Sequence, residues 1–242
     1  MVRPMILKLT DGAFQIKLGG TSATVLETND GPILIDTGWH WSRKKIQVGL
    51  NIIGYSLKDI HLIALTHFHP DHIGSAKLFK ETLRTPIAAH VKDAEIVSRK
   101  KSIHSTSFSR YGKFILNPFL SIVRGGIVEP EILLTDGEKL PTELDVETIH
   151  TPGHTLGSIC FYIPEKRLLI AGDAMEHRNG DLMPPSKFFS QNVAMGVESI
   201  KKLEKLDCEI ISLSHFDPVL SKGNKLITRF INRYLQSKNK LI

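Results

Sequence analysis

The chain has 242 residues, of which 41% are hydrophobic, and a formal net charge of +6 from 31 Lys and Arg against 25 Asp and Glu. This composition is typical of an ordinary soluble globular protein, and the length suits one domain, which we place at 1–242. The longest stretch without a charged residue, 148–164, is broken by Pro152 and two glycines and is too short for a membrane span. Because Lys8 directly follows a short apolar run, we expect no secretory signal and a cytoplasmic protein.

The positive net charge arises in the C-terminal segment. Every charged residue after Asp217 is basic, and apolar residues recur between these basic residues at helical spacing. We interpret the segment as an amphipathic surface helix with a solvated basic face, and we favour this over a nucleic-acid site. The basic residues are Lys222, Lys225, Arg229, Arg233, Lys238 and Lys240.

The first half of the chain begins as a β-meander. Runs rich in Val, Ile and Leu are separated by Asp-Gly, Gly-Gly and Asn-Asp-Gly turn signals. A helix-length stretch at about 42–53 then leads to a buried strand at 60–66, and from Ile73 the spacing becomes helical. We predict the opening strands at about 5–10, 13–18, 23–28 and 32–36.

The second half repeats this plan of strands followed by helices. Two strand-rich halves, each followed by helices, predict an α/β fold in which two sheets face each other with helices outside, a four-layer αββα sandwich. We predict strands near 132–135, 145–150, 158–163, 168–173 and 209–214, and helices near 193–206 and at the end of the chain.

A dense cluster of metal-binding side chains follows the buried strand, in the sequence THFHPDH. Along an extended chain His67 and His69 point the same way, because alternate side chains share a face. Pro70 then turns the chain, so that Asp71 and His72 face a second point nearby. This geometry suits two adjacent metal ions, and imidazole and carboxylate ligands suit zinc, iron or manganese.

Further motifs follow in order and carry a family resemblance. Asp36 ends the strand of PILIDTG, His154 lies in HTPGHTLGS, Asp173 ends LLIAGD and His215 follows EIISLS. Together with the His/Asp cluster these motifs resemble the metallo-β-lactamase superfamily over about residues 13–216. The resemblance implies the metallo-β-lactamase fold, which agrees with the sandwich predicted above.

The resemblance also implies a centre of two divalent metal ions, with zinc preferred and iron or manganese as alternatives. A water held between two such ions has a lowered pKa and becomes the nucleophile. Asp36 is expected to orient the ligands rather than carry protons, and it stands with Asp71 and His177 among the candidate catalytic residues. The implied ligands are His67, His69 and His154 for one ion, Asp71, His72 and His215 for the other, and Asp173 for both.

The motifs resemble most the hydrolase branch that includes glyoxalase II and the lactonases. True β-lactamases lack the bridging aspartate, so the presence of Asp173 argues against antibiotic hydrolysis as the main activity. We expect cleavage of a thioester, ester or lactone. The alternatives are a phosphodiesterase or ribonuclease of the same fold, an iron-dependent sulfur dioxygenase, and a binding protein without catalysis.

Lactonases place a tyrosine shortly after the bridging aspartate, and this chain has His177 in that region. His177 could donate a hydrogen bond to an oxyanion in place of the tyrosine, or it could be a plain loop residue.

The interval 96–128 combines basic and aromatic residues without an acidic one, and we predict short helices there that cover the metal cleft. Such a cover suits a small-molecule substrate with an anionic handle and an apolar body, and Phe119 would contact that body. A homodimer interface or plain packing explains the same pattern. Three further residues are candidate pocket residues, namely Trp39, His40 and Phe216.

Overall fold

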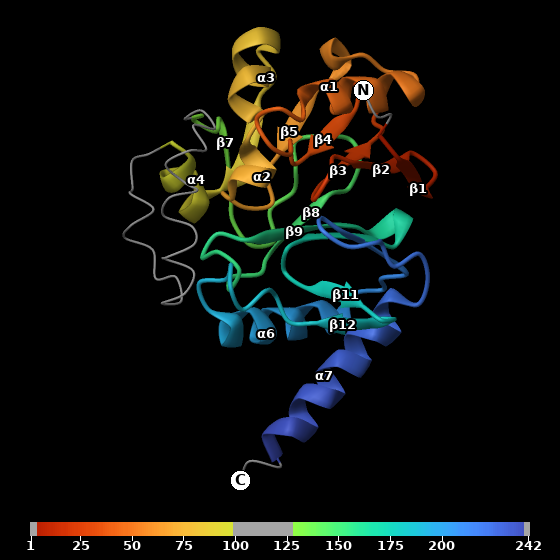
Figure 1. Ribbon diagram of the computed structural model, residues 1–242, viewed down its shortest axis with the longest axis vertical. Coiled ribbons are helices and arrows are strands. Elements are labelled where there is room, and N and C mark those ends of the chain that lie inside the picture. The colour runs from red at the N-terminus through yellow and green to blue at the C-terminus, as the bar shows by residue number, and fades with distance from the viewer. Residues whose placement is uncertain (1–3, 99–127, 240–242) are drawn as a thin grey trace.

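The computed structural model describes residues 4–98 and 128–239. Nearly all of the predicted cover at 96–128, including Phe119, lies outside these ranges. In the described part, two β-sheets lie face to face between helices (Figure 1). Helices α1 and α3 cover one side of the stacked sheets, and α6 and α7 cover the other. The predicted four-layer αββα sandwich is therefore confirmed.

The larger sheet has seven strands in the order β1-β2-β3-β4-β5-β6-β7. Its first four strands pair antiparallel, as expected for the meander, and its last four pair parallel. The strands are β1 (Ile6–Thr10), β2 (Ala13–Lys17), β3 (Ser22–Leu26), β4 (Ile33–Ile35), β5 (Leu62–Ala64), β6 (Ile87–His90) and β7 (Ile132–Leu134).

The smaller sheet has four strands in the order β13-β10-β9-β8, in which β10 and β13 are parallel. A separate hairpin of two strands, β11 and β12, follows β10. The bounds are β8 (Glu147–His150), β9 (Ile159–Ile163), β10 (Leu168–Gly172), β11 (Glu176–Arg178), β12 (Asp181–Met183) and β13 (Ile210–Leu213).

The helices fill the connections between strands. Helix α3 places Ala76 and Phe79 in the core at a spacing of three residues, and Asn192 caps α6 by accepting a hydrogen bond from the backbone of Met195. The helices are α1 (Arg43–Ile52), α2 (Pro70–Ile73), α3 (Ala76–Leu83), α4 (Val91–Val97), α6 (Val193–Lys202) and α7 (Gly223–Asn239), with short 3₁₀ turns η1 (Leu57–Asp59), η3 (Pro164–Lys166) and η4 (Leu203–Lys205).

The alternation of side chains along each strand creates three apolar layers. On β9, for example, Phe161 packs between the two sheets, whereas its neighbour Cys160 packs toward α6 and α7. A third layer joins the larger sheet to the helices outside it, where Ile46 and Phe79 are fully buried. The inner strands β4, β5, β9 and β10 are buried on both faces, and their sequences are therefore nearly continuous apolar runs.

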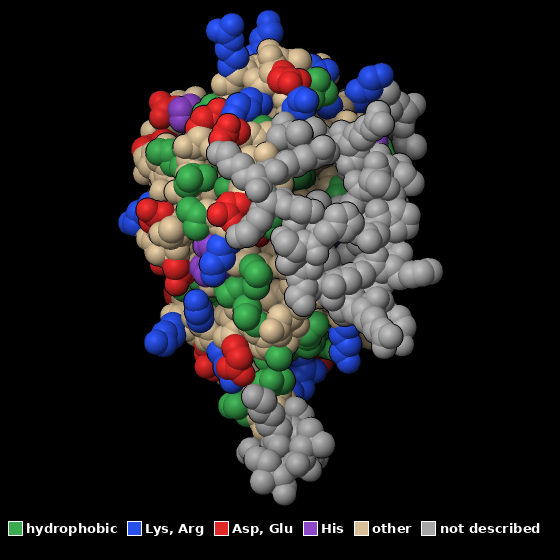
Figure 2. Space-filling view, turned by 90° about the vertical axis from the view of Figure 1, so that its left-hand side faces the viewer, with side chains coloured by type: hydrophobic (Ala, Val, Ile, Leu, Met, Phe, Trp, Pro, Cys, Tyr) green, Lys and Arg blue, Asp and Glu red, His purple; other side chains and the backbone are tan. Residues whose placement is uncertain are grey.

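The C-terminal helix was predicted with a solvated basic face. Helix α7 does pack its apolar residues against the smaller sheet. Two of its basic residues, however, form ion pairs with Asp181 of the β11–β12 hairpin, Arg229 at 3.2 Å and Arg233 at 2.9 Å. On the face shown in Figure 2, Lys and Arg side chains are interspersed with Asp and Glu over the described residues. No helix in the described ranges is both long and apolar enough to cross a membrane.

Candidate metal centre

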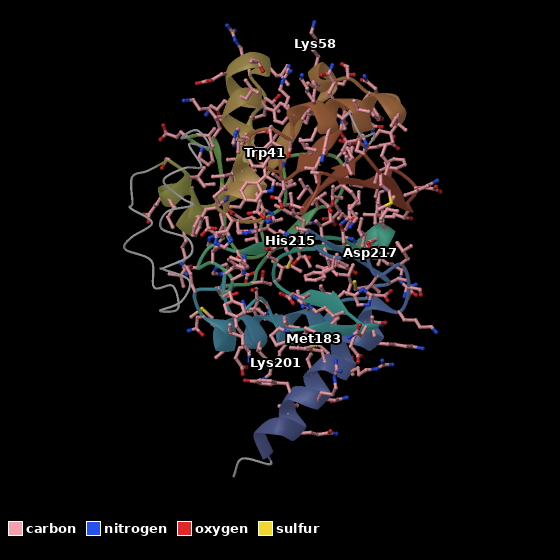
Figure 3. All side chains as sticks on the ribbon, in the orientation of Figure 1. Trp41, Lys58, Met183, Lys201, His215 and Asp217 are labelled. Carbon is pink, nitrogen blue, oxygen red and sulfur yellow. The ribbon has the colours of Figure 1, made fainter. Side chains whose placement is uncertain are left out.

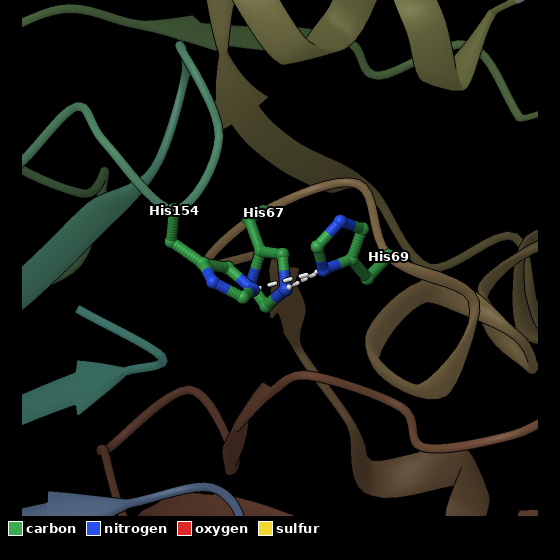
Figure 4. Close-up of side chains that lie close together, drawn as sticks. All are labelled: His67, His69 and His154. Atoms are coloured by element: carbon green, nitrogen blue, oxygen red, sulfur yellow. Dashed lines mark hydrogen bonds between the residues drawn. The ribbon is translucent and has the colours of Figure 1, made fainter. Parts of the chain in front are cut away.

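Three histidines from two loops bring ring nitrogens together at one point (Figure 4). The Nδ1 atom of His69 lies 3.0 Å from Nε2 of His67 and 2.9 Å from Nε2 of His154. All three side chains are buried, and burial lowers the pKa of His67 and His69 well below the usual value and that of His154 to about 4. The three imidazoles are therefore neutral, which is the form that binds a metal ion.

A second group of side chains lies beside the first and contains the carboxylates. Nε2 of His215 lies 3.2 Å from Asp71 and 3.1 Å from Asp173, and Nε2 of His72 lies 3.6 Å from each of the same two carboxylates. Oδ2 of Asp173, the atom near His215, also lies 3.3 Å from Nε2 of His154. Asp173 thus lies between the two groups, where a bridging carboxylate would be required.

The donor set fits divalent cations. Nε2 of His72 and Oδ1 of Asp173 are buried, face each other at 3.6 Å and have no hydrogen-bond partner in the described part of the chain. Burial lowers the pKa of His72, but the nearby carboxylates outweigh burial and raise it to about 9. The same balance raises the pKa of His215 to about 11. In the absence of metal, protons on His72 and His215 offset the negative charge of Asp71 and Asp173. Bound cations would offset the same negative charge.

Asp36 connects the two groups of ligands. Its carboxylate accepts hydrogen bonds from the backbone N–H and the hydroxyl of Thr66 and lies 2.8 Å from Nδ1 of His72. The same hydroxyl lies 3.0 Å from Nδ1 of His67. Asp36 has a φ of 62°, a strained conformation for a residue with a side chain that suggests a functional constraint. These contacts place Asp36 behind the candidate ligands, in a position to orient them.

The ligands lie at the carboxyl ends of strands that share one edge of the sandwich. Asp36 follows β4, His67 follows β5 and Asp173 follows β10, with His215 after the parallel neighbour β13. His154 comes from the loop between β8 and β9 and contacts Ser190 at 3.1 Å through Nδ1. Figure 3 shows His215 near the middle of the molecule, between the two halves of the sandwich. All seven predicted ligands are brought together.

One supporting residue was missed by the sequence analysis. Asp93, on the first turn of α4, is 1% exposed and accepts hydrogen bonds from the N–H of Phe68 at 3.0 Å and the hydroxyl of Thr155 at 2.7 Å. Phe68 lies between two ligands and Thr155 follows a third, so one carboxylate ties both ligand loops together. Gly157 packs so closely that a Cβ there would lie 2.3 Å from Asp93 Oδ1.

A cavity of about 430 Å³ opens onto the ligands. His69, Asp71, Asp173 and His215 line its polar end. The remaining wall is largely apolar or aromatic, with a Glu and an Arg from one strand. These wall residues include Trp39, Met175, Glu176, Arg178, Phe189 and Phe216. Its volume is within the range of small-molecule sites.

Of the predicted substrate residues within the described ranges, Trp39 and Phe216 line the cavity and His40 does not; the predicted catalytic residue His177 does not line it either. His40 is exposed and packs edge-on against Trp41, which stacks in turn on Trp39 at 5.3 Å. Trp41 lies above His215 in Figure 3. His177 lies between two cavity-lining residues of β11, so its side chain points to the opposite face and contacts the carbonyl of Asp217.

The hairpin that supplies Glu176 and Arg178 was also missed, although the sequence contains a signal for it. Asn179 and Gly180 both have positive φ, as the tight turns favoured in two-residue hairpins require. An Asn-Gly pair between short runs is a strong local hairpin signal.

The sequence matches the model of the metallo-beta-lactamase superfamily over residues 16–215. A Bacillus subtilis (strain 168) protein named "Probable metallo-hydrolase YybB" is 26% identical over 216 residues, which are 86% of each chain. A second protein of that organism, "Probable metallo-hydrolase YflN", is 27% identical over 74% of this chain and 72% of its own. A metallo-beta-lactamase family protein from Thermus thermophilus superimposes with a TM-score of 0.72 at 21% identity, covering 95% of this chain and 81% of that one.

Fold, site and family model agree. The chain belongs to the metallo-beta-lactamase superfamily.

Proposed function

We propose that this metal-dependent hydrolase cleaves a thioester, ester or lactone. The observation that carries the proposal is the position of Asp173 between a group of three histidines and a group of Asp71, His72 and His215, at one end of a largely apolar cavity. Relatives named metallo-hydrolases support the reaction class. Two divalent cations, zinc by preference, would supply Lewis acidity and a water of lowered pKa when bound there.

The residues of the chain prepare the site in four ways. His67, His69 and His154 offer neutral nitrogens at the buried end, and Asp36 fixes the ring of His72 through Nδ1. Asp71 lines the cavity, so its carboxylate can also accept a proton from the attacking water. The apolar wall around Trp39 and Phe216 excludes bulk water and receives an acyl body.

The phosphodiesterase alternative gains no support from the basic helix. Arg229 and Arg233 share an ion pair with Asp181, so part of the positive charge of this helix is offset within the protein. Among the described residues that line the cavity, Arg178 is the only Lys or Arg. A cavity with a single arginine and a largely apolar wall suits a small carboxyl substrate better than a nucleic acid. A nucleic acid is held through many phosphate contacts.

A matched substrate screen tests the proposal. Protein stripped of metal and then loaded with zinc, iron or manganese is assayed on an acyl thioester, an aryl ester, an acyl lactone and a phosphodiester. We expect metal-dependent turnover in the carboxyl class, lost in His154→Ala and retained in the surface variant Arg167→Gln. Faster turnover of the phosphodiester than of all three carboxyl substrates would overturn the proposal.

A further inference from the structure

Strand β11 presents an ion pair to the cavity. Glu176 and Arg178 occupy alternate positions on this strand, so both side chains lie on the face that lines the cavity, while His177 lies on the other. The strand itself is anchored, because its hairpin partner β12 is held to α7 by Asp181 and by a hydrogen bond from Arg233 to the carbonyl of Leu182. The pair is therefore part of a fixed wall.

The guanidinium group of Arg178 is held in place on two sides. Its Nε lies 2.7 Å from the carboxylate of Glu176, and its central carbon lies 5.0 Å from the ring centroid of Phe216. Its two Nη groups donate no hydrogen bond within residues 4–98 and 128–239, and the side chain is 58% exposed. Glu176 and the ring of Phe216 orient the guanidinium group, and its terminal N–H groups remain available. Such an arginine can bind a further planar acceptor.

The surroundings favour an anion with a single charge. Glu176 lies 2.7 Å from Nε of Arg178 and lines the same cavity, so a divalent anion at Arg178 would meet more repulsion from this carboxylate than a monovalent one. A carboxylate also matches the planar fork of a guanidinium group. Met175 and Phe189 line the cavity together with this pair and can contact a methylene chain.

We propose that Arg178 is a specificity-determining residue that binds a carboxylate at the end of the substrate remote from the bond that is cleaved. The inference rests on the proposed function, because it places the reacting carboxyl group at the metal ligands. The preferred substrate is then a monothioester or monoester of a dicarboxylic acid, with its chain along the apolar wall. This assigns the anionic handle to Arg178 of β11, whereas the sequence analysis had sought it in the interval 96–128.

The first test uses substrate pairs that differ only at the remote end. Metal-loaded enzyme is assayed on dicarboxylic monothioesters, from succinyl to suberyl, and on the monoacyl thioester of the same length, such as adipoyl against hexanoyl. We expect an optimal length at which the dicarboxylic substrate has the higher kcat/KM, chiefly through a lower KM. Arg178→Gln should lower its kcat/KM by about 10- to 100-fold, the usual effect of a charge-assisted hydrogen bond, and leave the monoacyl value unchanged.

Two further variants sharpen this result. Arg178→Lys keeps the charge without the fork and should retain part of the preference. Arg167→Gln removes an arginine that pairs with Asp207 away from the cavity and should retain all of it. A thioester of the same length that ends in a phosphate is assayed beside each pair. If wild-type enzyme treats both members of every pair alike, if it prefers this phosphate-ended thioester, or if Arg178→Gln slows both members equally, Arg178 does not bind a substrate carboxylate.

A binding experiment separates this inference from the proposed function. Calorimetry compares adipate with hexanoate on metal-loaded wild-type protein and on Arg178→Gln, with no turnover required. Tighter binding of adipate that is lost in Arg178→Gln supports the anion site even if wild-type protein hydrolyses no thioester, ester or lactone, a result that would overturn only the proposed function. Equal binding of both acids by wild-type protein, together with active hydrolysis, would overturn only the role of Arg178.

Discussion

Asp93 should make the stability of the protein depend on pH. Burial raises the pKa of this carboxyl group to about 7, and the hydrogen bonds from Thr155 and Phe68 offset only part of the effect. Between its unfolded pKa near 3.8 and about pH 7, the folded protein therefore holds a proton that the unfolded chain has released. Stability falls as pH rises through this range, because the folded state binds more protons.

The neutral variant Asp93→Asn provides the reference, since it has no carboxyl group to ionise. Above pH 7 wild-type protein bears the full cost of a buried carboxylate, about 4 kcal/mol for a shift of this size. Between pH 5 and pH 8 its stability relative to Asp93→Asn should fall by about 3 kcal/mol. The constant effect of the substitution itself cancels in this comparison.

Urea unfolding at several pH values, with chelator present in every sample, measures the difference. The pKa of the exposed Asp59 is lowered by a hydrogen bond from the backbone of Ser56, so Asp59→Asn is a control that should show no trend from pH 5 to pH 8. A wild-type minus Asp93→Asn difference that stays level over this range would refute the reasoning, because it would show that Asp93 ionises in the folded protein as it does in the unfolded chain.

Three further predictions concern the metal ligands and the basic helix. Asp36→Ala removes the partner of His72 Nδ1 and should weaken metal binding by about 10- to 100-fold in a chelator competition, and unchanged affinity would contradict its orienting role. Asp173→Ala should lose more than one metal ion per chain by elemental analysis or abolish turnover, whereas two retained ions with normal turnover would contradict a bridge. The double variant Arg229→Gln/Arg233→Gln should keep full hydrolytic activity, and any binding of RNA by wild-type protein should be weak and salt-sensitive; loss of activity would favour the nuclease alternative.

The sequence indicated the seven candidate metal ligands because their signals are local. His67, Asp173 and His215 each follow an apolar strand, and the carboxyl ends of neighbouring parallel strands meet at one sheet edge. The strands themselves were predicted well where both faces are buried, since a short apolar run rich in β-branched and aromatic residues, such as that of β9, is typical of a buried strand. Strand β6 was missed because its sequence IAAH is short and rich in alanine, which has little preference for strands.

The residues that could not be predicted act over long distances in the sequence. Asp93 contacts Phe68, 25 positions away, and Thr155, 62 positions away, and nothing in the sequence around Asp93 marks it as buried. The wall of the cavity depends in the same way on packing between β11 and the loop of Phe216. The sequence left the orientation of His177 open. The register of the β11–β12 hairpin decides which face of the strand this side chain occupies, and the sequence analysis had not recognised the hairpin.

Metal content measured together with hydrolysis tests the central claim most directly. Purified protein is reconstituted with zinc, and bound metal is quantified per chain as thioester, ester and lactone hydrolysis is followed during titration. The account predicts two ions per chain and activity that appears as the sites fill. A chain that binds no metal after reconstitution, or that binds two ions and hydrolyses none of these substrates, would contradict it.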